Sequence, residues 1–202
     1  MLSQLSTLKA RVGVADLDLQ YDDLLTNTLV ALSARFDNEC NRTFARTVDA
    51  THEFDSDDLE IIPPIFPIES VTKFELKENE TDGWAEQTDV EFIIRKNCTI
   101  SLATQPALIT LNASRSTFPP QARITYTGGY LLPGSADVPS ATRLPSDIEQ
   151  AAIEQAAAWF YRKDQLGLEI RWDHGGAYLR LSQLDLLPQV RAVLRRYERW
   201  AI

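Results

Sequence analysis

Apolar side chains recur at helical spacing in several parts of the chain, most clearly over residues 144–167. Ser146 and Glu149 have the spacing of a capping box, which would satisfy orphan amide groups at the helix start. Gly167 is placed to end the helix in a left-handed conformation. Because many of its residues are alanines with small side chains, neighbouring elements can approach its backbone closely. We predict that this is the central packing helix.

Three further helices are predicted around the central one. Residues 2–15 resemble a short amphipathic helix with a turn at Gly13, and residues 16–41 resemble a longer helix. The apolar face of this longer helix comprises Leu25, Leu29, Leu32, Phe36 and Cys40. The last helix is predicted to start near Leu187, with Pro188 in its first turn. Its apolar stripe comprises Val190, Val193, Leu194 and Tyr197.

Between residues 43 and 127 the hydrophobic period changes from helical to two, which is typical of half-buried strands. The candidate strands lie around residues 72–76, 90–94, 98–102, 109–111 and 122–126. Gly128 and Gly129 close this set, and a Pro/Gly/Ser-rich connection leads to the central helix. We therefore predict an α+β fold in which residues 1–42 and 144–202 form a helical core. Residues 43–143 form an inserted antiparallel β-sheet or sandwich with its linker.

Charge is distributed unevenly along the chain. The formal net charge is −9; residues 1–150 hold 12 Lys/Arg against 23 Asp/Glu, whereas residues 151–202 hold 8 against 6. Such an acidic body argues against tight, non-specific DNA binding, which depends on neutralising phosphates. Cys40 and Cys98 do not make a disulfide framework. With neither a signal-peptide pattern nor an apolar run of membrane-spanning length, we expect a protein made in the cytoplasm.

Candidates for catalysis are weak. His174, in the sequence Asp173-His174-Gly175-Gly176, could act as a base in a small hydrolase, but no nucleophile lies at motif spacing, which favours a surface turn. The acidic residues Asp55, Asp57, Asp58 and Glu60 lack the glycine and terminal glutamate of a calcium loop, which favours a solvated turn. Cys40 lies on an apolar helix face and is interpreted as a core residue. We predict no catalytic residue, no cofactor and no metal site.

The C-terminal helix carries the most informative functional pattern. Arg191, Arg195 and Arg199 lie at four-residue steps and would form one stripe beside the apolar face. Arg196 adds a fourth positive charge, and Tyr197 and Trp200 add aromatic surface. The stripe can be a solvated face, a docking element for carboxylates of a partner, or a DNA contact.

The order of elements, together with three loose motifs, resembles a known family. The motifs are Tyr-x-Gly-Gly-Tyr followed by Leu-Pro from Tyr126, Leu-Pro-x-Asp-Ile-x-x-Ala from Leu144, and Leu-Leu-Pro-x-Val-x-x-x-Leu from Leu186. The chain resembles the head–tail connector (adaptor, or head-completion) proteins of tailed double-stranded DNA bacteriophages and gene transfer agents. The resemblance covers most of the chain. The β-rich insert departs from the smaller, nearly all-helical members.

The resemblance implies a structural virion protein, not an enzyme. Such a protein forms an oligomeric ring, commonly twelve-fold, beneath the portal in the virion neck after DNA packaging. Its partners are the portal, the tail or a tail-completion protein, and double-stranded DNA that passes through the lumen without specific binding; no membrane is involved. The portal-docking residues would be Arg191, Arg195, Arg196, Tyr197, Arg199 and Trp200. The alternatives are a DNA-binding helical protein that uses the four arginines, and a virion protein whose sheet contacts the tail side or carbohydrate.

Overall fold

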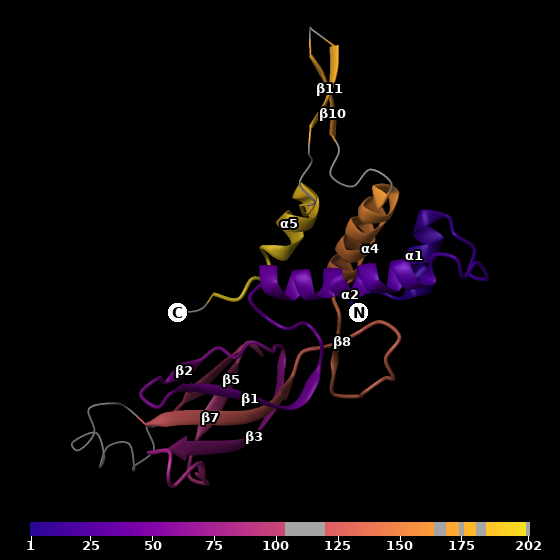
Figure 1. Ribbon diagram of the computed structural model, residues 1–202. Coiled ribbons are helices and arrows are strands. Elements are labelled where there is room, and N and C mark those ends of the chain that lie inside the picture. Colours follow the sequence, from indigo (N-terminus) through magenta and orange to yellow (C-terminus); the bar gives the residue numbers. More distant parts are fainter. Residues whose placement is uncertain (104–119, 164–168, 174–175, 181–184, 201–202) are drawn as a thin grey trace. The chain divides into compact units, whose positions relative to one another are not determined.

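The chain divides into two compact units in the computed structural model, which describes residues 1–103, 120–163, 169–173, 176–180 and 185–200 (Figure 1). The helical unit comprises Met1–Cys40, Leu132–Gly134 and Leu144–Glu198. The β-rich unit comprises Asn41–Leu131, Ser135–Arg143 and Arg199–Ile202. Helices together with antiparallel sheets confirm the predicted α+β class. Among the residues described, no helix is both long and apolar enough to span a membrane.

The helical unit is built around one helix, as predicted. Its helices are α1 (Leu5–Val12), α2 (Asp22–Glu39), α4 (Ser146–Tyr161) and α5 (Pro188–Leu194). Helix α4 contacts each of the other three, so it is the central packing element. It can do so because four of its alanines are buried and leave room for close approach. These are Ala151, Ala152, Ala156 and Ala157.

The ends of α4 differ from the prediction. The N-cap is Pro145, and no side chain caps the helix, so the predicted capping box is wrong. Ser146 is already the first helical residue, one position too late for its hydroxyl to act as the N-cap acceptor. The helix ends at Tyr161 with Arg162 as its C-cap. Gly167 lies outside the described residues.

Helix α2 starts at Asp22, later than predicted, because a buried lysine binds the preceding segment. Lys9 is only 2% exposed, and its Nζ donates to the carbonyl oxygens of Asp16 and Asp18, each at 2.7 Å. It also donates to the carboxylate of Asp22 at 2.8 Å. Those carbonyls are thus held outside the helix, and residues 16–20 form a loop. Helix α1 ends at Gly13 (φ 76°), as predicted.

The apolar stripe of α2 is confirmed, since Leu25, Leu29, Leu32, Phe36 and Cys40 are all buried. Cys40 forms no disulfide and is a core residue, as interpreted from its position. Its Sγ lies 3.5 Å from the carbonyl oxygen of Leu194 and so contributes to the packing of α5.

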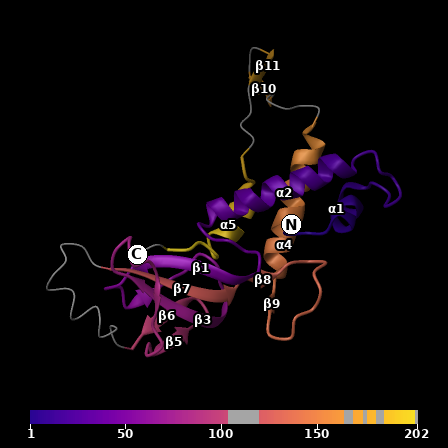
Figure 2. The same cartoon turned by 60° about the horizontal axis from the view of Figure 1, so that its bottom comes forward.

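The β-rich unit contains two antiparallel sheets (Figures 1 and 2). One has the order β1-β7-β3-β4, with bounds Thr47–Asp55, Gln121–Gly128, Ile68–Lys77 and Ala85–Glu86. The other has the order β2-β6-β5, with bounds Glu60–Ile61, Thr99–Leu102 and Phe92–Arg95. Side chains from both sheets share one core, which comprises Ile61, Ile68, Phe74, Leu76, Ile100, Leu102, Ala122, Ile124 and Tyr126. Two sheets around one core correspond to the sandwich form of the prediction.

Two smaller strand pairs complete the structure. Strands β8 (Tyr130–Leu131) and β9 (Thr142–Arg143) pair in parallel. Strands β10 (Glu169–Asp173) and β11 (Gly176–Arg180) pair antiparallel, whereas the sequence predicted only a surface turn there, at residues 173–176. Three residues of these strands, Ile170, Trp172 and Tyr178, are of the β-branched or aromatic types that favour strand pairing. His174 and the candidate strand at 109–111 lie outside the described residues.

Candidate partner-binding surface

The C-terminal helix is part of the helical core. Helix α5 begins at Pro188, as predicted, but it ends at Leu194, with Arg195 as its C-cap. Val190 and Leu194 are 1% and 2% exposed, so they belong to the packed interior. Val193 is only partly buried. This short helix is therefore anchored by its apolar face, and its polar side chains lie on the remaining surface.

A buried glutamine fixes the start of α5. Gln155 in α4 is 1% exposed, and its Oε1 accepts the N–H of Leu187 at 2.7 Å. Its Nε2 lies 3.5 Å from the carbonyl oxygen of Asp185. Gln155 lies on the same packed face of α4 as the buried Ile148 and Ala152, but this role was not predicted from the sequence. The sequence signal for this role is a polar residue on an otherwise apolar helix face, because a buried amide requires hydrogen-bond partners.

The predicted arginine stripe does not form, because the helix ends before it can continue. Arg195 is the C-cap of α5, and Arg199 lies beyond the helix in the β-rich unit. There the Nε of Arg199 donates to the carbonyl oxygen of Ile62 at 2.9 Å. The prediction of one continuous stripe through Arg191, Arg195 and Arg199 is therefore wrong.

Two of the six predicted docking residues make contacts inside the helical unit. Arg191 pairs with Asp185. The pKa of Asp185 is lowered, chiefly because its carboxylate accepts the N–H of Leu186 and to a smaller extent because of Arg191. The hydroxyl of Tyr197 donates to the carboxylate of Asp147, 2.8 Å from Oδ1 and 3.0 Å from Oδ2. This bond joins the segment after α5 to the first turn of α4. Both residues stabilise the helical unit itself.

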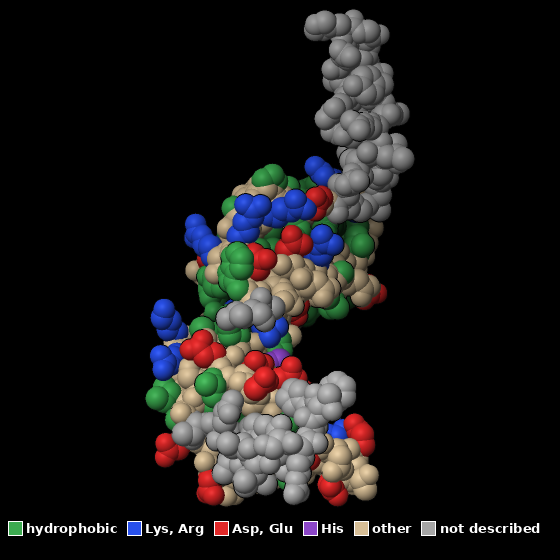
Figure 3. Space-filling model, turned by 90° about the vertical axis from the view of Figure 1, so that its left-hand side faces the viewer, with side chains coloured by type: hydrophobic (Ala, Val, Ile, Leu, Met, Phe, Trp, Pro, Cys, Tyr) green, Lys and Arg blue, Asp and Glu red, His purple; other side chains and the backbone are tan. Residues whose placement is uncertain are grey.

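With Arg199 bonded to Ile62, three predicted docking residues remain, and they face outward. Arg195 and Arg196 are exposed on the helical unit. Trp200 is 75% exposed and belongs to the β-rich unit. A hollow of about 330 Å³ beside α5 is lined by Glu39, Arg191, Leu194, Arg195 and Glu198. On this side of the molecule basic side chains gather, with acidic ones among them (Figure 3). Such mixed charge suits a protein partner better than a polyanion.

A buried ionic cluster in the β-rich unit serves the fold. Glu75 is 5% exposed; it accepts from Lys73 Nζ at 2.8 Å and from Arg123 Nε at 2.9 Å. Burial raises the pKa of Glu75, but these two hydrogen bonds and the positive charges lower it further, so the net shift is downward. Arg123 also lies 4.2 Å from the centroid of Trp84. Because both carboxylate oxygens of Glu75 accept from cations of the same unit, the cluster has the character of a structural brace.

The acidic cluster at residues 55–60 is an exposed turn after β1, closed by the N–H of Asp58 donating to the carbonyl oxygen of Asp55 at 3.0 Å. Asp55, Asp57, Asp58 and Glu60 are all exposed. In the described part of the chain, no group of three or more His, Cys, Asp or Glu residues could hold a metal ion.

His52 in β1 makes the stability of the β-rich unit depend on pH. Its pKa is lowered, chiefly by burial and then by the charge of Arg199, with Glu53 opposing. The unfolded state therefore binds a proton more readily than the folded state. Stability is lost as pH falls from the ordinary histidine value, about 6.5, towards the lower folded value.

We expect His52→Gln to remove this loss. Urea unfolding at about pH 7.5 and about pH 5.5 should show a smaller stability loss for the variant than for the parent chain. The difference cannot exceed about 1.4 kcal/mol per pH unit for a single group. Carboxylates that titrate in the same pH range contribute equally to the stability loss of both proteins, so their contribution cancels in the comparison. Identical pH slopes for the two proteins would contradict the assignment.

No protein-family model matches the chain, and no curated protein sequence does. Solved structures do match. A chain in the "Virion of native gene transfer agent (GTA) particle" has a TM-score of 0.56 at 16% identity. A chain in the "Neck of empty GTA particle computed with C6 symmetry" has 0.55 at 14%, and one in the "Neck of native GTA particle computed with C12 symmetry" has 0.52 at 15%. Each match covers 98% of this chain and 89% of the other.

At the level of the fold, these matches confirm the resemblance to proteins of gene transfer agent particles. Because they cover 98% of this chain, they include the β-rich unit as well as the helices. The large insert between helices, which the sequence shows as a departure from the smaller members, is thus compatible with the fold of these chains.

Proposed function

We propose that the chain is a structural protein of the neck of a tailed, phage-like particle. Twelve copies form a ring beneath the portal, extend the DNA channel and join the head to the tail after packaging. The observation that carries this proposal is the fold shared over 98% of the chain with chains of gene transfer agent particles, including a neck computed with C12 symmetry. The protein is made in the host cytoplasm and functions in the virion neck.

The charge of the molecule supports passage of DNA without binding. A net charge of −9 would repel a polymer that carries one charge per about 1.7 Å of its axis. Of the four arginines considered for DNA contact, Arg191 pairs with Asp185, and Arg199 is bonded to a backbone carbonyl oxygen. These contacts weaken the case for a DNA-binding protein. We therefore propose no enzymatic and no DNA-reading role.

Within the ring, we assign the predicted helical core, residues 1–42 and 144–202, to a connector core with the exception of Arg199–Ile202, which belong to the β-rich unit. Residues 43–143 form an inserted subdomain. The helices of the core make the lateral contacts between neighbouring copies. Portal docking falls to the C-terminal segment, with Arg195, Arg196 and Trp200 as the outward-facing contacts. Arg191, Tyr197 and Arg199 support that segment through their bonds to Asp185, Asp147 and Ile62.

Charge reversal tests the docking assignment. We expect Arg195→Glu/Arg196→Glu to weaken binding to the purified portal by about tenfold or more. In the variant, two glutamates replace two exposed cations and would repel the carboxylates of the partner. A deletion of residues 187–202 is unsuitable, since it removes the buried Val190 and Leu194. The readout is portal affinity across a salt series, with a thermal melt to verify folding.

The chain offers a matched control in Arg95→Glu/Lys96→Glu, which reverses two adjacent, exposed cations at the end of β5. This control changes the net charge equally and should leave portal affinity within about twofold. If both double variants bind the portal equally well, the docking assignment is rejected.

A further inference from the structure

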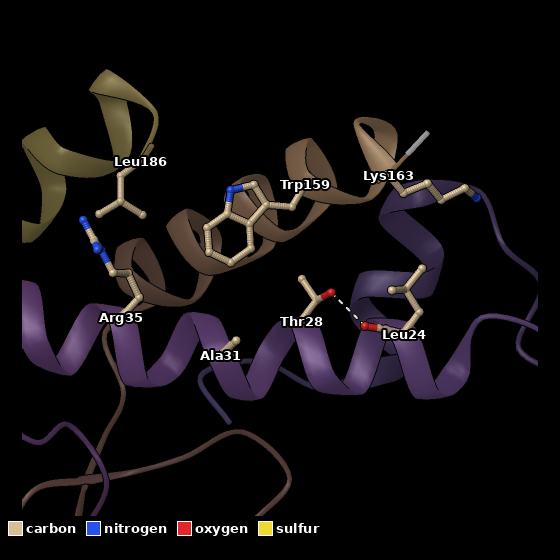
Figure 4. A pocket seen from close by; sticks show the side chains of 7 residues that line it. All are labelled: Leu24, Thr28, Ala31, Arg35, Trp159, Lys163 and Leu186. Atoms are coloured by element: carbon tan, nitrogen blue, oxygen red, sulfur yellow. Dashed lines mark hydrogen bonds between the residues drawn. The ribbon is translucent and has the colours of Figure 1, made fainter. Parts of the chain in front are cut away.

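The helical unit contains an apolar groove between α2 and α4 that the portal-docking proposal does not use. Its volume is about 430 Å³ (Figure 4). Its lining residues are Leu24, Thr28, Ala31, Arg35, Trp159, Lys163 and Leu186. Leu24 is 44% exposed, and Trp159 lies between the two helices. Apolar surface of this kind on a helix pair favours the docking of a complementary segment.

The two ends of this α2–α4 groove are basic. Arg35 lies beside Leu186 at one end and Lys163 beside Leu24 at the other (Figure 4). The side chain of Arg35 is 51% exposed, although Glu39 lies 3.5 Å away. Nζ of Lys163 lies 4.0 Å from the ring centroid of Tyr21. An occupant with leucine-like side chains and flanking carboxylates would therefore complement the groove in both shape and charge.

Trp159 adds a polar feature to the groove. Its Nε1 is buried and has no acceptor among the residues that the structure describes. A buried indole N–H usually finds a hydrogen-bond partner. Because this atom is closed to solvent, an incoming carboxylate or backbone carbonyl oxygen can accept its N–H only once the Trp159 side chain turns toward the groove.

The 16–20 loop of the same chain has the matching chemistry. Leu17 and Leu19 are 94% and 73% exposed, an unusual arrangement for two neighbouring leucines. They alternate with Asp16 and Asp18, which are also exposed. Lys9 holds the loop backbone through the carbonyl oxygens of Asp16 and Asp18. The loop is thus fixed before it meets a partner, which lowers the entropic cost of binding.

We propose that the 16–20 loop of one copy docks into the α2–α4 groove of the next copy. Loop and groove are different surface features, so the contact is head-to-tail, and repetition of such a contact forms a ring when the rotation between neighbouring copies closes. Leu17 and Leu19 enter the apolar part of the groove, and Asp16 and Asp18 meet Arg35 and Lys163. The inference rests on the proposed ring function and supplies its lateral contact.

Two variants remove the two sides of the contact separately. Leu17→Ser/Leu19→Ser removes the apolar loop side chains, and Ala31→Trp fills the groove from an exposed position on α2. By sedimentation velocity over a concentration series, each variant should self-associate at least about tenfold more weakly than the parent chain. The matched control is Val48→Ser/Leu59→Ser, which removes two apolar side chains, 56% and 46% exposed, from the β-rich unit and should associate normally.

Mixing the two disabled variants gives the decisive result. The loop variant keeps an intact groove, and the groove variant keeps an intact loop, so an equimolar mixture should form heterodimers and no larger rings. If the parent chain associates but the loop variant associates equally well, the loop is not the occupant; the inference is overturned, and the ring proposal stands. If the parent chain remains monomeric at every concentration, the loop–groove contact is rejected, and the ring proposal is judged separately in the presence of the portal.

Discussion

Gly129→Ala is expected to destabilise the β-rich unit by about 4 kcal/mol or more, a large part of the stability of an ordinary domain. Gly129 has φ 97°, where an L side chain is strained. A Cβ there would also lie 2.5 Å from the carbonyl oxygen of Ala45 and 2.8 Å from the Cα of Arg46. Both neighbours are backbone atoms, so neither can turn aside as a flexible side chain could.

The close approach at Gly129 is needed because the backbone pairs on both sides of it. The N–H of Gly129 donates to the carbonyl oxygen of Pro67 at 2.8 Å, and the N–H of Tyr130 donates to that of Phe44 at 2.7 Å. Any shift that relieved the clash would lengthen these bonds. Urea and thermal unfolding of the purified variant measure the loss.

Gly83→Ala is the matched control for this prediction. Gly83 also has a positive φ, 70°, but a Cβ there meets nothing within 4 Å. The Gly83→Ala substitution should lower the free energy of unfolding only by the conformational strain, about 1–2 kcal/mol. Equal losses at Gly83 and Gly129 would show that the contact with Ala45 does not determine the stability of this turn.

Lys9→Met is expected to destabilise the helical unit by about 2–4 kcal/mol. Methionine preserves most of the apolar stem but removes an ammonium that is 2% exposed and makes three hydrogen bonds. Two backbone carbonyls and the carboxylate of Asp22 then lose their donor. Denaturant unfolding gives the magnitude, and the same variant should weaken self-association because the 16–20 loop is no longer held.

A double-mutant cycle with Asp22→Asn isolates the ionic part of the effect. The two changes together should cost at least about 1 kcal/mol less than the sum of the single changes, because each alone leaves one charge unpaired. Lys96→Met, at an exposed position, should stay within about 0.5 kcal/mol of the parent chain. Strict additivity of Lys9→Met and Asp22→Asn would contradict the observed ion pair.

The features that the sequence predicts correctly are those set by local periodicity. The stripe from Leu25 to Cys40 is buried as expected, and Ala122, Ile124 and Tyr126 of β7 point into the β-rich core. Each of these patterns repeats within one helix or strand, so the side-chain direction follows from the period alone. The α+β class follows from the change of period near residue 43.

The features that the sequence does not predict depend on partners far away along the chain. The arginine stripe failed because α5 ends at Leu194 and Arg199 bonds to Ile62, 137 positions away. The hydrogen bond of Tyr197 to Asp147 spans 50 positions. The delayed start of α2 reflects Lys9, which competes for backbone carbonyls that a helix would otherwise use. No local pattern specifies any of these contacts.

We propose that copies of this chain hold one another and the portal in register around the DNA channel. Electron micrographs of the purified protein mixed with the portal test it most directly. The proposed function predicts closed rings of twelve copies stacked coaxially on the portal. Single, unassembled copies of the chain beside intact portal particles would contradict it.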